Sequence, residues 1–252
     1  MTMTVYAVHE NGRWVLENAL PRKTSGWPRA SVGQINFFHE PGLVFDPAKA
    51  RRAAAFIDSL ASAFDLSRPA PLDYYVTSSV DEALNILGLQ FPVKYGPNGA
   101  FSKPVNHQVF NGMPTIGEEH RHELAHVVMA PLLVGSPTIL ATEGVATWLG
   151  GIEGVDFRGS VRHLAGYLAA HPKITLDSIL ESGSIPQFVK YSGGAVLSEM
   201  LAESGGTPAL KEFLTAGPGT AELRAALVHL LHQPWAAIMS AWRTSIDRLL
   251  PT

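Results

Sequence analysis

One stretch of the chain carries histidine and glutamate residues at a spacing that suits metal chemistry. His122 and His126 stand four residues apart within EEHRHELAHVV at 118–128. Apolar residues recur every three or four positions through this stretch, which predicts a helix. Side chains four apart on a helix share a face, with Cβ atoms about 6 Å apart, so two imidazole nitrogens can converge on one ion. Because the chain contains no cysteine, any metal must be held by His, Asp or Glu.

The glutamate beside the first histidine adds a possible base to these two ligands. Glu123 completes the pattern His-Glu-x-x-His and can accept a proton from a water molecule activated by the ion. The competing interpretation is a polar helix face exposed to solvent. Each helical residue turns by about 100°, so His120 is expected to face away from the pair, at the surface. Glu118 is expected to stabilise the positively polarised N-terminus of the helix.

Two further stretches follow in chain order. Glu143 lies in TILATEGVATWLGG, a helix-prone run that is separated from HELAH by 16 residues, and Trp148 follows the Glu-Gly-x-Ala segment. Tyr191 and Gly194 lie in YSGGAVLSEML. Together with HELAH, these motifs resemble the gluzincin zinc metallopeptidases, in particular the thermolysin and aminopeptidase N type. The resemblance runs from about residue 105 to the C-terminus.

The resemblance implies a role for each residue. His122, His126 and Glu143 would hold Zn²⁺, Glu123 would be the catalytic base, and the Tyr191 hydroxyl would hydrogen-bond the oxyanion of the reaction intermediate. Small residues after Glu143, such as Gly144 and Ala146, are expected to let its helix approach the histidine helix closely.

The sequence departs from these families in two places. The aminopeptidases bind the free amine of their substrate with a Gly-x-Met-Glu-Asn segment, whereas NGMPTIG at 111–117 keeps a Gly-Met and lacks Glu-Asn. Exopeptidase specificity is therefore not implied. Thr147 follows Glu143 by four residues, where thermolysin has a carboxylate that orients a ligand, so another group must orient the ligands here.

The function that these motifs predict is zinc-dependent hydrolysis of a peptide or protein substrate. Two alternatives stay open. The chain can be a peptide-binding or scaffold module with a vestigial or structural zinc site, or a zinc hydrolase of a non-peptide substrate, because the same ligands activate water toward other electrophiles. Substrate side chains, endo- or exo-cleavage, and oligomeric state are left open by these residues.

Composition narrows the partners. The 252 residues carry a formal net charge of −3, and their basic residues are scattered, so no nucleic-acid partner is expected. No apolar run is long enough for a membrane span, and MTMTVYAVHENG lacks the features of a signal peptide. The compartment is open, although the resemblance favours an extracytoplasmic bacterial setting if the chain is part of a longer one.

Periodicity and turn residues predict an α+β fold, and the resemblance a thermolysin-like zincin catalytic domain with a small N-terminal mixed sheet lobe and a helical C-terminal lobe. Residues 1–27 are expected to form a hairpin around Asn11-Gly12 and a linker. Residues 28–116 would form an α/β lobe. Its first half would contain a strand at 31–40, a helix capped by Asp46 and a strand at 72–78. Its second half would contain a helix capped by Ser79, an irregular connection at 91–104 and an edge strand at 105–110. That strand would run beside the metal helix and could pair with an extended peptide. Residues 117–252 would form a helical lobe with helices at 117–130, 139–150, 158–170, 191–204, 207–215, 219–232 and 234–249.

Overall fold

The structure is a computed structural model that describes residues 1–67, 70–91, 98–133 and 137–248. The chain divides into two compact units, which we call the sheet unit (Met1–Ser59 and Arg68–Val127) and the helical unit (Leu60–Ser67 and Val128–Thr252). The mixed α and β composition, with a small sheet part and a helical part, agrees with the predicted class.

The elements follow in chain order. The strands are β1 (Thr2–Met3), β2 (Val5–Glu10), β3 (Arg13–Asn18), β4 (Arg29–Val32), β5 (Ile35–His39), β6 (Leu72–Val76), β7 (Leu89–Gln90), β8 (Ala100–Lys103) and β9 (Gln108–Asn111). The helices are α1 (Leu20–Lys23), α2 (Pro47–Ala63), α3 (Val80–Ile86), α4 (Arg121–Met129), α5 (Ile139–Gly150), α6 (Phe157–Ala170), α7 (Leu176–Glu181), α8 (Gln187–Leu214), α9 (Thr220–Leu231) and α10 (Trp235–Asp247). Two short 3₁₀ turns are η1 (Pro104–Asn106) and η2 (Ala130–Leu132).

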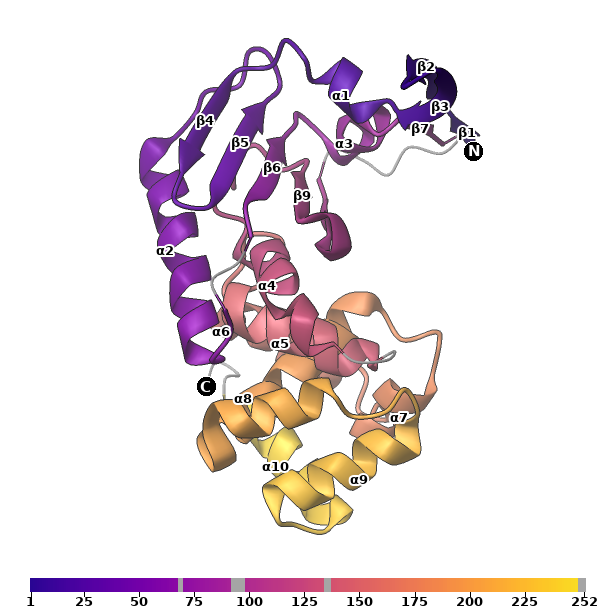
Figure 1. Cartoon of the computed structure of the whole chain (residues 1–252). Helices are drawn as coiled ribbons and strands as arrows, with labels where there is room; N and C mark the ends of the chain where they lie inside the picture. The colour runs from indigo at the N-terminus through magenta and orange to yellow at the C-terminus, as the bar shows by residue number, and fades with distance from the viewer. Residues whose placement is uncertain (68–69, 92–97, 134–136, 249–252) are drawn as a thin grey trace. The chain divides into compact units, whose positions relative to one another are not determined.

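The sheet unit is built on a five-stranded sheet with the strand order β4-β5-β6-β9-β8. Strands β5, β6 and β9 are parallel, and the outer strands β4 and β8 are antiparallel to their neighbours. Figure 1 shows β4, β5, β6 and β9 side by side, with β6 between β5 and β9. As in any β-strand, successive residues of β6 point to opposite faces of the sheet.

The strand order corrects two expectations. The strand expected over 31–40 is two strands, because Gly33 turns the chain with a φ of 60° between β4 and β5. The expectation that residues 105–110 form an edge strand is also wrong. Strand β9 pairs with β6 and with β8, and the edge on this side of the sheet is β8, which lies in a stretch expected to be irregular. Residues 92–97 of that expected connection lie outside the described residues.

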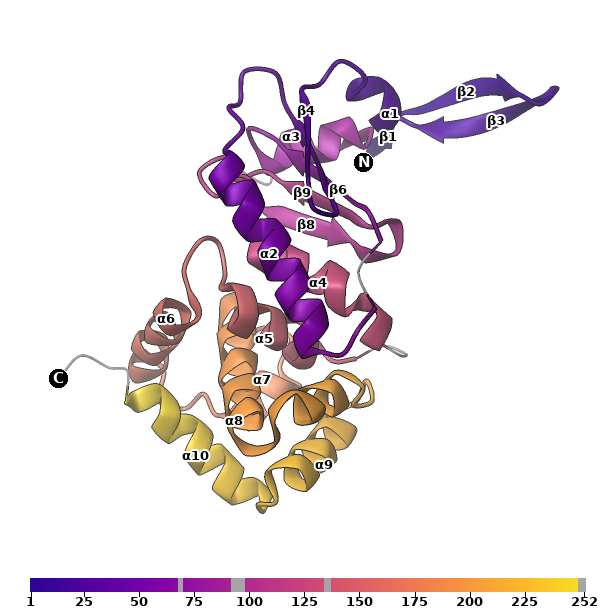
Figure 2. The ribbon, with the colours of Figure 1, turned by 60° about the vertical axis from the view of Figure 1, so that its left-hand side comes forward.

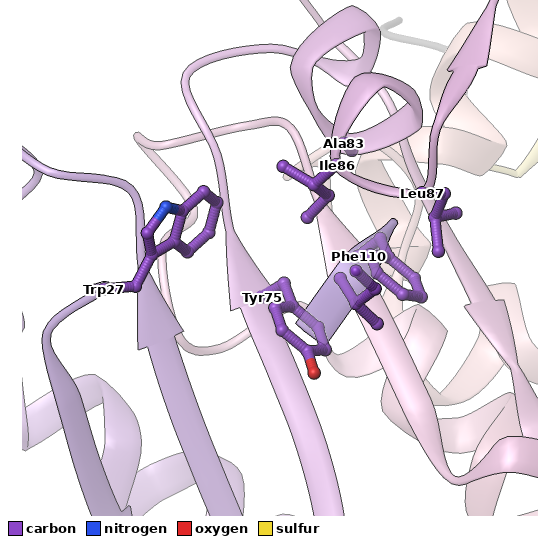
Figure 3. Close-up of a cluster of buried hydrophobic side chains, with 7 residues drawn as sticks. Trp27, Tyr75, Ala83, Ile86, Leu87 and Phe110 are labelled. Carbon is purple, nitrogen blue, oxygen red and sulfur yellow. The ribbon is translucent and has the colours of Figure 1, made fainter. Parts of the chain in front are cut away.

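One face of the sheet carries a row of aromatic rings. Phe38, Tyr75, Phe110 and Phe101 lie in successive strands, and their ring centroids are 4.7, 5.0 and 5.0 Å apart in that order. Figure 3 shows Tyr75 and Phe110 in a cluster with Ile86 and other apolar side chains of α3 and its C-terminal end. Burial of this apolar surface is a main source of stability for the unit.

Local turn and capping signals in the sheet unit are confirmed. Asn11 and Gly12 have φ values of 49° and 79°, and they join β2 to β3 in the hairpin that Figure 2 shows extending from the unit. The Asp46 carboxylate accepts hydrogen bonds from two backbone N–H groups in the first turn of α2. The Ser79 hydroxyl accepts one from Glu82 N–H at the start of α3.

The helical unit agrees with the predicted helices in most places. Helix α5 spans 139–150 as expected, and α8 packs against α5, α6, α7, α9 and α10. The expected break between 204 and 207 is a kink at Gly206, whose φ of 61° lies in the left-handed region, inside a longer α8. Helix α7 was not predicted. Residue 249, the expected end of the last helix, lies outside the described residues. In the part of the chain that the structure describes, no helix is long and apolar enough to cross a membrane.

Helices α5 and α8 meet at two glycines. A Cβ atom added to Gly144 would lie 2.5 Å from the carbonyl carbon of Gly194, and one added to Gly194 would lie 2.9 Å from Gly144 Cα. The two backbones therefore touch directly. Gly144 was expected to let α5 approach α4, the helix with the two histidines. The helix that it lets α5 approach is α8, because the three atoms nearest to this Cβ position all belong to α8.

We expect Gly144→Ala to destabilise the protein, because the added methyl group has no space at this crossing. Overpacking of this kind costs about 1–3 kcal/mol. The matched control is Gly166→Ala in α6, where a Cβ atom meets nothing within 4 Å. That change is expected to stabilise by about 0.5–1 kcal/mol, because alanine favours the helix. Thermal melting measures both, and a Gly144→Ala protein as stable as Gly166→Ala would contradict the close approach.

Candidate metal centre

Helix α4 places the two histidines of the motif on one face. The Nε2 atoms of His122 and His126 lie 3.2 Å apart, and the ring centroids lie 4.9 Å apart. Two nitrogens bound to one tetrahedral zinc ion at about 2.0–2.1 Å would lie about 3.3 Å apart. The imidazoles therefore already have the separation that a shared zinc ion requires. A hydrogen bond between two rings gives a similar distance, so the third residue decides between the interpretations.

The third residue is Glu143 of α5. Three residues, His122, His126 and Glu143, could hold a metal ion. Each offers one ligand atom, and these three atoms all lie within 4.8 Å of one another. Two imidazoles and one carboxylate match the donor set of catalytic zinc sites, which keep a fourth position for water or substrate. The residues present therefore fit a zinc ion. The N-cap of α5 is Thr138, whose hydroxyl accepts a hydrogen bond from Ala141 N–H and fixes where this helix begins.

Burial around the motif differs from a solvated helix face. Only 5% of His122 and 8% of Glu123 is exposed, while His126 and Glu143 are half-buried. Leu124 and Ala125, between the two histidines, are fully buried. A buried polar side chain needs a partner to offset the loss of water, so this arrangement favours a functional site over a polar surface.

Tyr191 lies in the helical unit, near the start of α8. It is half-buried and precedes Gly194 by one helical turn, so the two lie on the same side of α8. Gly194 contacts Gly144, which is next to Glu143. Tyr191 therefore lies on the side of α8 that meets α5, which is the helix carrying Glu143.

His120 is a correction. It was expected at the surface, but it is 6% exposed, and its ring centroid is 6.4 Å from that of His122. Burial lowers the pKa of His120 to about 3, and the nearby His122 and His126 lower it further in smaller measure. At neutral pH the ring is therefore uncharged, which keeps a competing positive charge away from a cation site.

Glu118 is a second correction. Instead of serving the N-terminus of α4, its Oε1 atom accepts hydrogen bonds from the His39 ring at 2.8 Å and from Asp46 N–H at 2.9 Å. Glu118 is 1% exposed. Burial alone would raise its pKa, but these two hydrogen bonds, together with one to its own backbone and the charge of His39, outweigh burial and lower the pKa below its usual range. The charged Glu118 thus ties the segment before α4 to β5 and to the start of α2.

The two departures from the resembled families also have structural correlates. The Asn111 side chain, in the segment that lacks Glu-Asn, makes hydrogen bonds with backbone groups of Met113 and Gly117. Thr147 is fully buried, and its hydroxyl has no hydrogen-bond partner within the described parts of the chain. Neither the segment 111–117 nor Thr147 supplies the carboxylate that the resembled families have at these places.

Among the comparisons with known proteins, the one with solved structures found similar folds. No family model matches the sequence, and no curated protein matches it. Among solved structures, the chain is similar to a variant of an M1 zinc metallopeptidase from Deinococcus radiodurans bound to a Tyr-Ser-Ala substrate. The identity is 18%, the match covers 89% of this chain and 52% of the other, and the TM-score is 0.50. A two-domain M1 zinc metallopeptidase variant bound to L-tryptophan matches with 16% identity, a TM-score of 0.48, and coverage of 86% and 50%.

The chain thus spans about half the length of these solved structures. An identity of 18% shows a likeness of the fold alone. The group of three possible metal ligands is an observation independent of this likeness.

Proposed function

We propose that this chain is a zinc-dependent peptidase of the gluzincin type, with a thermolysin-like catalytic fold. The observation that carries the proposal is the group formed by His122, His126 and Glu143, whose ligand atoms lie within 4.8 Å of one another. Glu123, next to the first ligand, supplies the base that a purely structural site would not need. Similarity of fold to an M1 zinc metallopeptidase supports the same class.

Each residue has one task in the proposed reaction. A zinc ion held by His122, His126 and Glu143 would supply a Lewis acid that lowers the pKa of water toward 7 and polarises the scissile carbonyl. Glu123 accepts the proton of the attacking water and later gives it to the leaving amine. Tyr191 donates a hydrogen bond to the developing oxyanion, which a phenol can do without carrying charge.

We also propose that the substrate binds in extended form along β8. This strand, not β9, is at the edge of the five-stranded sheet, where an added strand can pair through its backbone. Backbone pairing holds a peptide largely irrespective of its side chains. The function would then combine a sheet edge that aligns the peptide with a metal centre that cleaves it.

The experiment that tests the function combines metal analysis with peptide digestion. The purified chain should contain about one zinc ion, and it should cleave a mixed-peptide library in a reaction that a chelator stops and added zinc restores. Zinc without cleavage would favour a binding or scaffold module. Cleavage of other electrophiles with no cleavage of peptides would favour a non-peptide hydrolase, and either result contradicts the proposal.

For Tyr191, we expect Tyr191→Phe to lower kcat by about 10²- to 10³-fold and to leave KM and zinc content nearly unchanged, because the lost hydrogen bond acts on the transition state. Tyr167→Phe in α6 is the matched control, since Tyr167 is also a half-buried helical tyrosine. Steady-state kinetics on one cleaved peptide measures both variants. A Tyr191→Phe enzyme with the kcat of Tyr167→Phe would remove this residue from the mechanism.

A further inference from the structure

The segment before the metal helix is held by two buried side chains from the sheet. The Tyr74 hydroxyl donates to the carbonyl oxygen of Gly117 at 2.8 Å and accepts from the backbone N–H of His120 at 3.1 Å. The Asn111 amide donates to the same Gly117 oxygen at 2.6 Å. Tyr74 and Asn111 are both 0% exposed. We call this pair the Gly117 clamp.

The clamp acts at the point where α4 begins. The carbonyl of His120 accepts the first intrahelical hydrogen bond, from Leu124 N–H at 3.1 Å, so His120 is the N-cap residue. Its own N–H group would be buried without a partner if Tyr74 did not accept from it. Gly117 has a φ of 65°, a conformation that glycine adopts readily, and it lies on the other side of the same turn. The phenol thus bridges both ends of the turn that leads into α4.

The clamp is rigid because of its place in the sheet. Tyr74 belongs to β6, the central strand, and pairs in register with Phe37 on one side and Val109 on the other. Its ring packs against Phe37 with a centroid distance of 5.3 Å. Asn111 is the last residue of the neighbouring strand β9. Burial raises the pKa of Tyr74 well above its usual range, so the hydroxyl keeps the proton that it donates.

The phenol therefore fixes the position and rotation of α4 relative to the sheet. The Tyr74 hydroxyl accepts a hydrogen bond from the N–H of His120. His122 lies two residues after His120, and His126 lies one helical turn further. A rotation or slide of α4 would carry both Nε2 atoms along together and change the direction in which the pair points from the sheet. Groups that support metal ligands in this manner change metal affinity when they are removed.

We propose that the Gly117 clamp positions the ligands of the candidate metal centre, with Tyr74 as its main positioning residue. This inference rests on the proposed function, because it takes His122 and His126 as metal ligands. Tyr74 touches neither the ion nor the substrate in this assignment. It acts by holding the helix that carries the ligands.

The test compares Tyr74→Phe with Tyr75→Phe in the full chain. Tyr75 is the next residue of the same strand, is 4% exposed, and lies in the aromatic cluster on the opposite face. The measurements are zinc affinity by competition with a chromophoric chelator, the visible absorption spectrum of the cobalt(II)-substituted protein, and the melting temperature of the metal-free protein. We expect Tyr74→Phe to weaken zinc binding by about 10- to 100-fold and to change the cobalt spectrum, with both unchanged in Tyr75→Phe.

The outcomes separate this inference from the proposed function. A Tyr74→Phe protein that melts at a lower temperature but keeps the wild-type affinity and cobalt spectrum has lost only stability, and the inference is overturned. If Tyr74→Phe does not fold, Asn111→Ser removes the other donor to the Gly117 carbonyl, and an unchanged zinc affinity and cobalt spectrum in that variant overturn the inference equally. A wild-type chain that binds no zinc overturns the proposed function and this inference with it.

Discussion

Glu123→Gln is expected to retain zinc and lose turnover. Glutamine keeps the size of the side chain and can still hydrogen-bond, but it cannot accept a proton from water. General-base catalysis contributes about 10²- to 10⁴-fold, so kcat should fall by at least that factor while the zinc content is preserved. Because Glu123 is 8% exposed, the isosteric change also avoids creating a cavity.

Zinc content by elemental analysis and kcat on a cleaved peptide measure this result on the same preparation. Glu203→Gln is the control, since Glu203 is an exposed glutamate of α8. Full activity in Glu123→Gln would show that Glu123 is not the base. Loss of zinc would show that the residue acts on the metal site itself.

His126→Ala is expected to lose both zinc and activity. The change removes one of three proposed protein ligands, and the remaining pair cannot enclose the ion in the geometry of a catalytic zinc site. A second consequence concerns stability. A metal that binds only the folded protein stabilises it by mass action, so a chelator should lower the melting temperature of the wild type and have no effect on His126→Ala.

The control for this change is His163→Ala in α6, an exposed histidine away from the motif in sequence. It should keep the zinc content and the chelator sensitivity of the wild type. Equal zinc content in His126→Ala and His163→Ala would leave the two histidines of α4 as an ordinary hydrogen-bonded pair.

Local signals in the sequence predicted local structure well. Asp46 and Ser79 cap helices because each side chain needs only backbone N–H groups two or three residues away. Asn11-Gly12 forms a turn because both residues adopt positive φ values at low cost. The spacing of His122 and His126 was equally local, and it correctly placed their rings beside each other on one helix.

Pairing between distant segments was harder to predict. Gly33 and Gln34 separate β4 from β5 inside a stretch that alternates like one strand, and the pairing of β4 with β5 reveals the turn. The edge position of β8 depends on which strands flank β9, and periodicity does not contain that information. Glu143 was found through a resemblance to a family, since its 16-residue distance from HELAH follows from no local rule.

Burial near the site was the least predictable feature. The rotation of a helix gives the direction in which His120 points, but not what packs on that side, and the residue is buried. Tyr74 lies 43 residues before Gly117 and Asn111 lies six residues before it, and neither carries a signal that links it to α4. Gly144 was recognised as a contact residue, but its partner Gly194 became evident only from the packing of α5 on α8.

The most direct measurement is a crystal structure of the zinc-loaded protein with anomalous diffraction data collected on both sides of the zinc absorption edge. We expect one zinc peak bound to Nε2 of His122, Nε2 of His126 and a carboxylate oxygen of Glu143, each at about 2.0–2.2 Å, with a fourth position open to water. A zinc peak elsewhere, or a Glu143 carboxylate turned away from a zinc ion on the two histidines, would contradict it.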